Sequence, residues 1–321
     1  MNNRDTAVDI VKAIGILSVI LGHCVAIPQM PFRHFIFTFH MPLFFLISGY
    51  FFKPRGIRTS LICDTKRLMI PYFVTCGAVV VLTSIKSLFL EDNKSALYYL
   101  AATFIGSGSS HLCLYLSDLP NIGAIWFFPA LLVCKNAYLL LSKYPINKRL
   151  LYSVIIYIAA TLIGRYLIFI PFSILCGLSA IVFYAIGDYY KTTKCKITWV
   201  HWLIGITCWF LSFRFSRILL VQPRTDFYFI DVVGSTTATY LLYRLSVKIT
   251  ELCKHNVIMP WIGRNSMYIL CFHLIDQDLG FSGFITKSFH PICLVVSMLV
   301  LPILCTLLYK KIAGIIKVKR I

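Results

Sequence analysis

Apolar stretches of about 20 residues recur along the whole 321-residue chain, and they constrain its fold more than any other feature. A helix of that length crosses a hydrocarbon core roughly 30 Å thick, and inside lipid a helix satisfies its own backbone hydrogen bonds. Hydrophobic residues make up 59% of the chain, charged residues make up 13%, and the mean hydropathy is +0.80. These values exclude an ordinary soluble domain and predict an all-α, polytopic integral membrane bundle.

The pattern predicts about ten transmembrane helices in one membrane-embedded domain over residues 1–321, without a soluble domain. Their approximate bounds are 8–27, 35–52, 69–90, 123–142, 150–168, 170–189, 198–216, 228–247, 258–277 and 288–309. The first stretch lacks a small-residue cleavage site, so we interpret it as a retained helix and not a signal peptide. With the N-terminus inside, 19 of the 31 Lys and Arg residues fall in cytoplasmic segments and seven fall outside. This asymmetry predicts that both termini are cytoplasmic.

Charge and cysteine content exclude two other classes of protein. The net charge of +19 is spread over short loops, so we expect membrane lipids and not nucleic acid as its partner. No two of the twelve cysteines lie closer than twelve residues, which excludes the C-x-x-C spacing of zinc and redox sites. We therefore expect the cysteines to act as small hydrophobic residues and expect no metal site.

One polar stripe follows the first apolar stretch. Lys12 and His23 are eleven residues apart and nearly eclipsed on a helix, and Asp9 lies within about 40° of His23. A stripe of ionisable groups must face protein or water and is a candidate functional site. Lys12 and His23 lie about 16 Å apart along the axis, whereas Asp9 can pair with Lys12 at a spacing of three. The alternative is a helix-anchoring ion pair and a packed core histidine.

Two further histidines are expected near the outer surface with His23. His40 lies just inside the second predicted helix and His273 lies near the outer end of the ninth. An imidazole can remove a proton from a hydroxyl group or accept an acyl group, which is the chemistry of acyl transfer. Two alternatives use the same histidines: they are core residues with their hydrogen bonds made inside the protein, or they form the proton relay of a transporter.

Basic residues on the opposite, inner side are candidates for binding phosphate. Lys66 and Arg67 directly precede the third predicted helix, and Arg264 lies just inside the ninth. Such groups bind phosphate through charge-assisted hydrogen bonds, although the neighbouring cations of residues 53–67 also set the topology. Trp126 is a candidate for stacking on a substrate, or an anchor at the membrane interface.

The order of these motifs resembles the acyltransferase family 3 of membrane-bound acyltransferases, particularly its fucose 4-O-acetylase-like branch. The stretches that carry the resemblance are "RDTAVDIVKAIGILSVILGHC", "FTFHMPLFFLISGYFF", "KRLMIPYF", "IWFFPALL" and "IGRNSMYILCFH". They are spread over nearly the whole chain in the family's order. The resemblance implies O-acylation, usually O-acetylation, of an extracytoplasmic surface glycan by cytoplasmic acetyl-CoA, in the inner membrane of a bacterium.

The resemblance also implies roles for particular residues. The family's essential first-helix histidine falls on His23, and its cytoplasmic Arg/Lys-rich motif falls on Lys66 and Arg67. Combined with the analysis of the residues, this gives a hypothesis in which His40 lies beside His23 at the reacting group and the phosphates of acetyl-CoA lie near Lys66 and Arg67. The family commonly has arginine where this chain has Lys12. The lysine ammonium is a point charge, whereas an arginine guanidinium can form two parallel hydrogen bonds to one ligand. On this hypothesis Lys12 and Arg264 assist the donor phosphates and Asp9 orients Lys12, whereas His273 and Trp126 contact the carbohydrate. The acceptor is either lipid-linked or polymeric.

The main alternative is a membrane transporter for a proton-coupled solute or a glycan precursor, with the same histidines as its relay. A non-catalytic membrane subunit has no obvious use for the stripe. The oligomeric state is not predicted.

Overall fold

The computed structural model describes residues 5–24, 31–87, 96–109, 120–166, 170–194, 196–216, 218–253, 255–280 and 291–318. Apart from one isolated antiparallel bridge between Leu219 and Arg224, the regular structure in these ranges is helical, which confirms the all-α prediction. The helices are α1 (Thr6–His23), α2 (Phe32–Phe37), α3 (His40–Tyr50), α4 (Ile57–Ser87), α5 (Ala96–Ile105), η1 (Gly123–Trp126), α6 (Phe127–Leu141), α7 (Ile146–Tyr166), α8 (Ile174–Ser179), α9 (Ile181–Thr193), α10 (Trp199–Phe215), α11 (Tyr228–Leu252), α12 (Ile258–Arg264), α13 (Ser266–Leu279) and α15 (Pro291–Val318).

Helices occupy all ten predicted stretches, but they do not form ten continuous spans. In the described part of the chain, five segments are long and apolar enough to cross a membrane: Thr6–His23, Ile57–Ser87, Gly123–Leu141, Ile146–Arg165 and Ile292–Ile315. These helices indicate a multi-pass integral membrane protein. The stretches 35–52, 170–189 and 258–277 are each divided between two helices.

The break before α3 has a local cause. Pro42 is the third residue of α3, in the first turn, where the missing N–H removes no intrahelical hydrogen bond. Had the helix continued unbroken from α2, Pro42 would have removed a bond and pressed on the preceding turn. The chain therefore begins a new helix at His40, which places this residue at a helix terminus.

The prediction for the third helix was wrong at its start. We expected it to begin near residue 69, after a basic connection, but α4 begins at Ile57 and includes Pro71 in its interior. Hydropathy detects only the apolar part of such a helix, whereas its first turns also contain Arg58, Lys66 and Arg67, which are polar but have good helix propensity. The basic residues Lys66 and Arg67 are consequently held on a helix and not on a loop.

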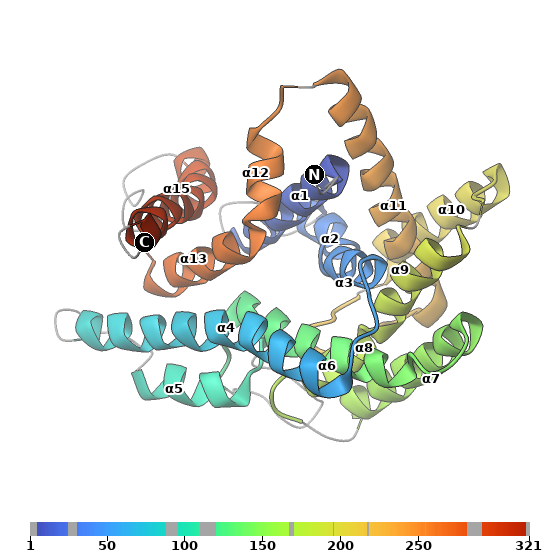
Figure 1. The fold of residues 1–321 in the computed structure, drawn as a ribbon, viewed down its shortest axis with the longest axis horizontal. Coiled ribbons are helices and arrows are strands. Elements are labelled where there is room, and N and C mark those ends of the chain that lie inside the picture. The colour runs from blue at the N-terminus through green and yellow to red at the C-terminus, as the bar shows by residue number, and fades with distance from the viewer. Residues whose placement is uncertain are drawn as a thin grey trace.

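Helix α1 lies in the middle of the bundle and packs against α3, α11, α12 and α13 (Figure 1). On the other side of the molecule α4 and α5 run side by side, and α6 packs against α4. Glycines allow the closest approaches: a Cβ on Gly49 of α3 would meet the backbone of Tyr184 in α9, and one on Gly263 would meet the Asp9 carbonyl oxygen. Such small residues let helix backbones approach one another in membrane bundles.

Candidate active site

A cavity of about 350 Å³ lies between α1, α3, α4, α6 and α13. Helix α1 contributes Lys12, Ile16 and Val19 to its wall, at the spacing that places residues on one helix face. His23 is the next residue on that face, one turn beyond Val19. The predicted polar stripe thus faces protein, and the cavity follows it from Lys12 toward His23.

The end of the cavity near Lys12 is strongly basic. Five cationic side chains line it together with a single carboxylate, a formal excess of four positive charges. They are Lys12, Lys53, Arg55, Arg67 and Lys135, with Asp64 as the acidic residue. The hydroxyl-bearing residues Ser48, Ser60 and Ser266 add further hydrogen-bonding groups. We call this set of residues the basic end.

An ion pair that the sequence analysis missed lies within the basic end. The Lys135 ammonium of α6 pairs with the Asp64 carboxylate of α4, and the Ser60 hydroxyl donates to the same carboxylate at 3.1 Å. Lys135 is a lone cation within a predicted transmembrane stretch, which is the signal that identifies a candidate functional residue. Asp64 gave no comparable signal, because it lies in a stretch that we interpreted as a cytoplasmic loop.

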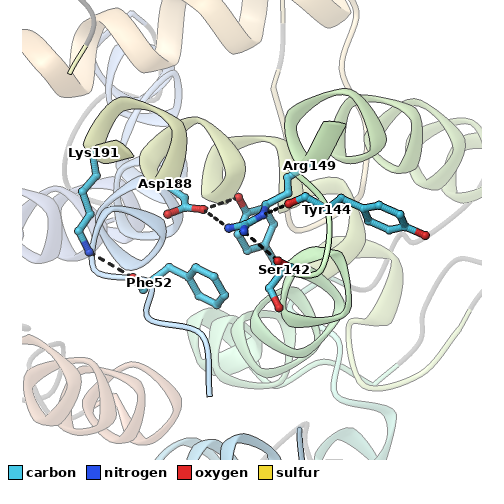
Figure 2. Close-up of polar contacts among 7 residues, drawn as sticks. Phe52, Ser142, Tyr144, Arg149, Asp188 and Lys191 are labelled. Carbon is cyan, nitrogen blue, oxygen red and sulfur yellow. Dashed lines mark hydrogen bonds and ion pairs between the residues drawn. The ribbon is translucent and has the colours of Figure 1, made fainter. Parts of the chain in front are cut away.

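A buried polar network supports the wall of the basic end (Figure 2). The Arg149 guanidinium donates to the Asp188 carboxylate at 3.2 Å, and the Tyr138 hydroxyl donates to the same oxygen at 2.7 Å. Lys191 donates to the Phe52 carbonyl at 3.2 Å, and the Phe52 ring, which lines the cavity, packs edge-on against Tyr138. This network fixes the segment that leads from α3 to Lys53 and Arg55.

The opposite end of the cavity is apolar and leads to the histidines. Val19, Met41 and Leu270 line it, and each lies within four residues of a histidine on its own helix: His23, His40 and His273 respectively. The rings of His23 and His273 have centroids 6.0 Å apart. Helices α1 and α13, which are distant in sequence, therefore bring His23 and His273 together beyond this end of the cavity, and His40 directly precedes the wall residue Met41. We call these three histidines the histidine end.

His40 is oriented by its surroundings. Its Nδ1 donates to the Ile36 carbonyl at 3.0 Å, which leaves Nε2 as the acceptor of the neutral ring. Its ring packs against Phe37 at a centroid distance of 4.9 Å. The absence of a side chain on Gly22 makes room for the Phe37 ring beside α1. His40 thus has one nitrogen committed to the backbone and one available for chemistry.

His273 is fully buried, with an exposed fraction of 0%, and neither of its ring nitrogens has a hydrogen-bond partner among the described residues. Buried polar atoms are normally paired, so His273 is a candidate for a polar contact with a ligand. Within the described ranges no group of three or more His, Cys, Asp or Glu side chains has the arrangement of a metal site.

The other predicted site residues lie outside the cavity wall. Asp9 is 2% exposed and packs against α12, whereas Lys66 and Arg264 are exposed. Trp126 is buried against Gly108 and is not part of the wall, although its neighbours Ala124 and Phe127 are. Of the donor-binding residues predicted from sequence, the structure thus brings only Arg67 to the cavity, together with Lys12.

The described helices thus surround a cavity that is basic at one end and approaches buried histidines at the other. The chain belongs to the acyltransferase 3 family, whose acyltransferase domain matches residues 5–311. It is therefore a membrane acyltransferase, and this membership favours an enzyme over the transporter considered above.

Two curated relatives match part of the chain. The nodulation protein NolL of Sinorhizobium fredii is 36% identical over 91 residues, which cover 24% of this chain and 25% of the relative. The nodulation protein NolL of Mesorhizobium japonicum is 30% identical over 119 residues, which cover 33% of this chain and 32% of the relative. The chain thus spans about a quarter to a third of these relatives. No solved structure matches it.

Proposed function

We propose that this protein is an O-acetyltransferase that moves an acetyl group from cytoplasmic acetyl-CoA to a hydroxyl group of an extracytoplasmic surface glycan. The observation that carries the proposal is the cavity along one face of α1, which runs from the basic end through an apolar section toward the histidines that lie beyond it. The basic end would bind the donor, and the histidine end would be the place of reaction.

The charge and length of the cavity support acetyl-CoA as the donor. Its diphosphate and ribose phosphate are anions that suit an excess of four positive charges, with Arg67, Arg55 and Lys12 as the principal ligands. Its pantetheine arm is equivalent to about four extended residues, or roughly 14 Å. Lys12 and His23 lie about 16 Å apart along α1, so the thioester would reach the histidine end from phosphates bound at Lys12.

At the histidine end, His23 would act as the general base. It removes the proton of the acceptor hydroxyl as the alkoxide oxygen attacks the thioester carbonyl carbon, and the C–S bond breaks to release CoA as a thiolate. The histidinium then returns the proton to the sulfur. In the covalent alternative, a ring nitrogen accepts the acetyl group first and the glycan hydroxyl attacks this acetyl-histidine. In both routes His40 lies beside the reacting group and His273 contacts the acceptor.

The membrane arrangement follows from the same assignment. The basic end would face the cytoplasm, where acetyl-CoA is made, and the histidine end would face outward, with ten membrane-crossing segments and both termini inside. The distribution of Lys and Arg, 19 inside and seven outside, supports this orientation. We place the protein in a bacterial inner membrane, with a lipid-linked or polymeric glycan as acceptor.

Membranes that contain the protein, radiolabelled acetyl-CoA and host glycan test this proposal. We expect label on the glycan with the wild-type protein and its loss in His23→Ala, whereas His255→Ala, at an exposed position, should transfer normally. Binding of CoA to the same membranes should be unchanged in all three proteins. Label transfer that persists in His23→Ala would contradict the assigned role.

A further inference from the structure

We propose that the acceptor carries an anionic group and that Arg33 is the residue that binds it. This inference rests on the proposed acetyl transfer and deepens it by naming the chemical class of the acceptor. Arg33 belongs to α2 and was counted in the sequence only among the outer charges.

Arg33 is part of the histidine end by its contacts. Its guanidinium carbon lies 5.2 Å from the centroid of the Phe37 ring, and the same ring packs against His40 at 4.9 Å. The Phe37 ring also lies against Gly22, the residue that precedes His23. Arg33, Phe37 and His40 thus form a stack beside the proposed general base.

Among the described residues, Arg33 lacks the partners that a half-buried guanidinium normally has. Its Nε is buried without a hydrogen-bond partner, and no carboxylate within the described ranges forms an ion pair with it. Arg149 provides an internal comparison, because its guanidinium donates to the Asp188 carboxylate and to the carbonyls of Tyr144 and Ser142 (Figure 2). A ring face does not replace an acceptor for the N–H groups, so Arg33 is prepared for an external anion.

The position of Arg33 assigns that anion to the acceptor and not to acetyl-CoA. The donor phosphates have their own five cations at the basic end, and Lys12 is about 16 Å from His23 along α1. Arg33 is not among the residues that line the cavity, and the ring that it contacts, Phe37, packs against His40, the first residue of α3, whereas the cavity-lining residues of α3 follow His40. We therefore assign Arg33 to a molecule that meets the histidines from outside the cavity.

The chemistry of the two unpartnered groups defines the ligand. A guanidinium binds carboxylate or phosphate oxygens through two parallel hydrogen bonds, and the buried His273 nitrogens suit hydroxyl groups. The acceptor is therefore a hydroxyl-rich molecule with carboxylate or phosphate oxygens. These oxygens come either from an acidic sugar or from the diphosphate of a lipid carrier.

Acetyl transfer to modified acceptors tests the proposal in membranes that contain the full chain. Lipid-linked host glycan is used untreated, after chemical reduction of its carboxyl groups, and after mild acid removal of its lipid diphosphate. Each preparation is titrated with wild type, Arg33→Gln and Arg33→Lys. Arg214→Gln is the matched control, because Arg214 is exposed and, like Arg33, contacts the face of a phenylalanine ring, that of Phe215 at 5.4 Å.

We expect one of the two treatments to raise the acceptor KM of wild type roughly ten- to hundredfold, the range for a hydrogen bond to a charged group. Arg33→Gln should have that raised KM already and should not respond to the treatment. The acceptor KM of Arg33→Lys should lie between those of wild type and Arg33→Gln, because lysine keeps the positive charge but cannot form two parallel hydrogen bonds. Carboxyl reduction as the effective treatment identifies an acidic sugar, and removal of the diphosphate identifies the lipid carrier.

Equal responses of wild type and Arg33→Gln to both treatments would overturn the inference while leaving the proposed function intact. Absence of transfer by wild type to every preparation would instead overturn the proposed function and this inference with it. Binding of radiolabelled CoA at the basic end reports folding independently. If Arg33→Gln fails to bind CoA, the comparison is made with Arg33→Lys, which must then show the raised KM.

Discussion

Replacing Lys135 with methionine tests whether the ion pair of the basic end holds α6 against α4. The Lys135 and Asp64 side chains are 23% and 10% exposed, so the pair is largely removed from solvent. Breaking a buried pair by removing one partner costs about 3–5 kcal/mol, because the other charge remains buried. Here the Ser60 hydroxyl still donates to the carboxylate and the cavity lies alongside, so we expect Lys135→Met to lower the free energy of unfolding by about 2–3 kcal/mol.

A double variant distinguishes the cost of an unpaired Asp64 carboxylate from the cost of losing the packing of the Lys135 side chain. Lys135→Met combined with Asp64→Leu removes both charges, and we expect it to be about 2 kcal/mol more stable than Lys135→Met alone. The assay is unfolding of the purified protein by SDS titration in mixed micelles, followed by tryptophan fluorescence. A double variant no more stable than the single one would refute the reasoning, since the cost would then come from lost packing and not from an unpaired carboxylate.

The same variants test the charge of the basic end. Lys135→Met reduces its formal excess from four to three positive charges, whereas Asp64→Asn increases it to five. We expect the KM for acetyl-CoA to rise about fivefold in Lys135→Met and to fall in Asp64→Asn, with both effects weaker at high salt. KM values that are the same in both variants would show that the donor phosphates bind elsewhere.

Two matched pairs give further predictions. Gly263→Ala should lower the free energy of unfolding by about 1–3 kcal/mol in the same assay, because the added Cβ meets the Asp9 carbonyl oxygen. Gly77→Ala, whose added Cβ enters open space on α4, should be neutral or slightly stabilising. Equal losses in the two variants would contradict the close packing of α12 on α1. Arg67→Gln should raise the KM for acetyl-CoA about tenfold, while Lys66→Gln, exposed and outside the cavity, should change it less than about twofold. A larger effect at Lys66 would place the donor outside the cavity.

The family match confirms the resemblance, but the structure places the side chains of the motif residues differently with respect to the cavity. Lys66 and Arg67 are adjacent in the sequence motif, yet consecutive residues on a helix point in directions about 100° apart, and only Arg67 reaches the cavity. Arg264 is separated from the cavity for a related reason, because α12 ends there and Ser266, the first residue of α13, lines the wall instead. Motif spacing therefore located segments that border the cavity, and the structure decides which of their side chains line it.

Sequence alone determined the helical class, the membrane environment and the polar stripe, because apolar length and the 3.6-residue period are local properties that need no knowledge of neighbours. It also placed Lys12 and His23 on one face, since both belong to one helix. Only the tertiary structure decided which groups from other helices meet that face. The approach of His273 to His23 and the pairing of Lys135 with Asp64 join residues far apart in sequence, and their contact depends on how the helices pack. The partner of a buried group is a property of packing, whereas the need for a partner is already visible in the sequence.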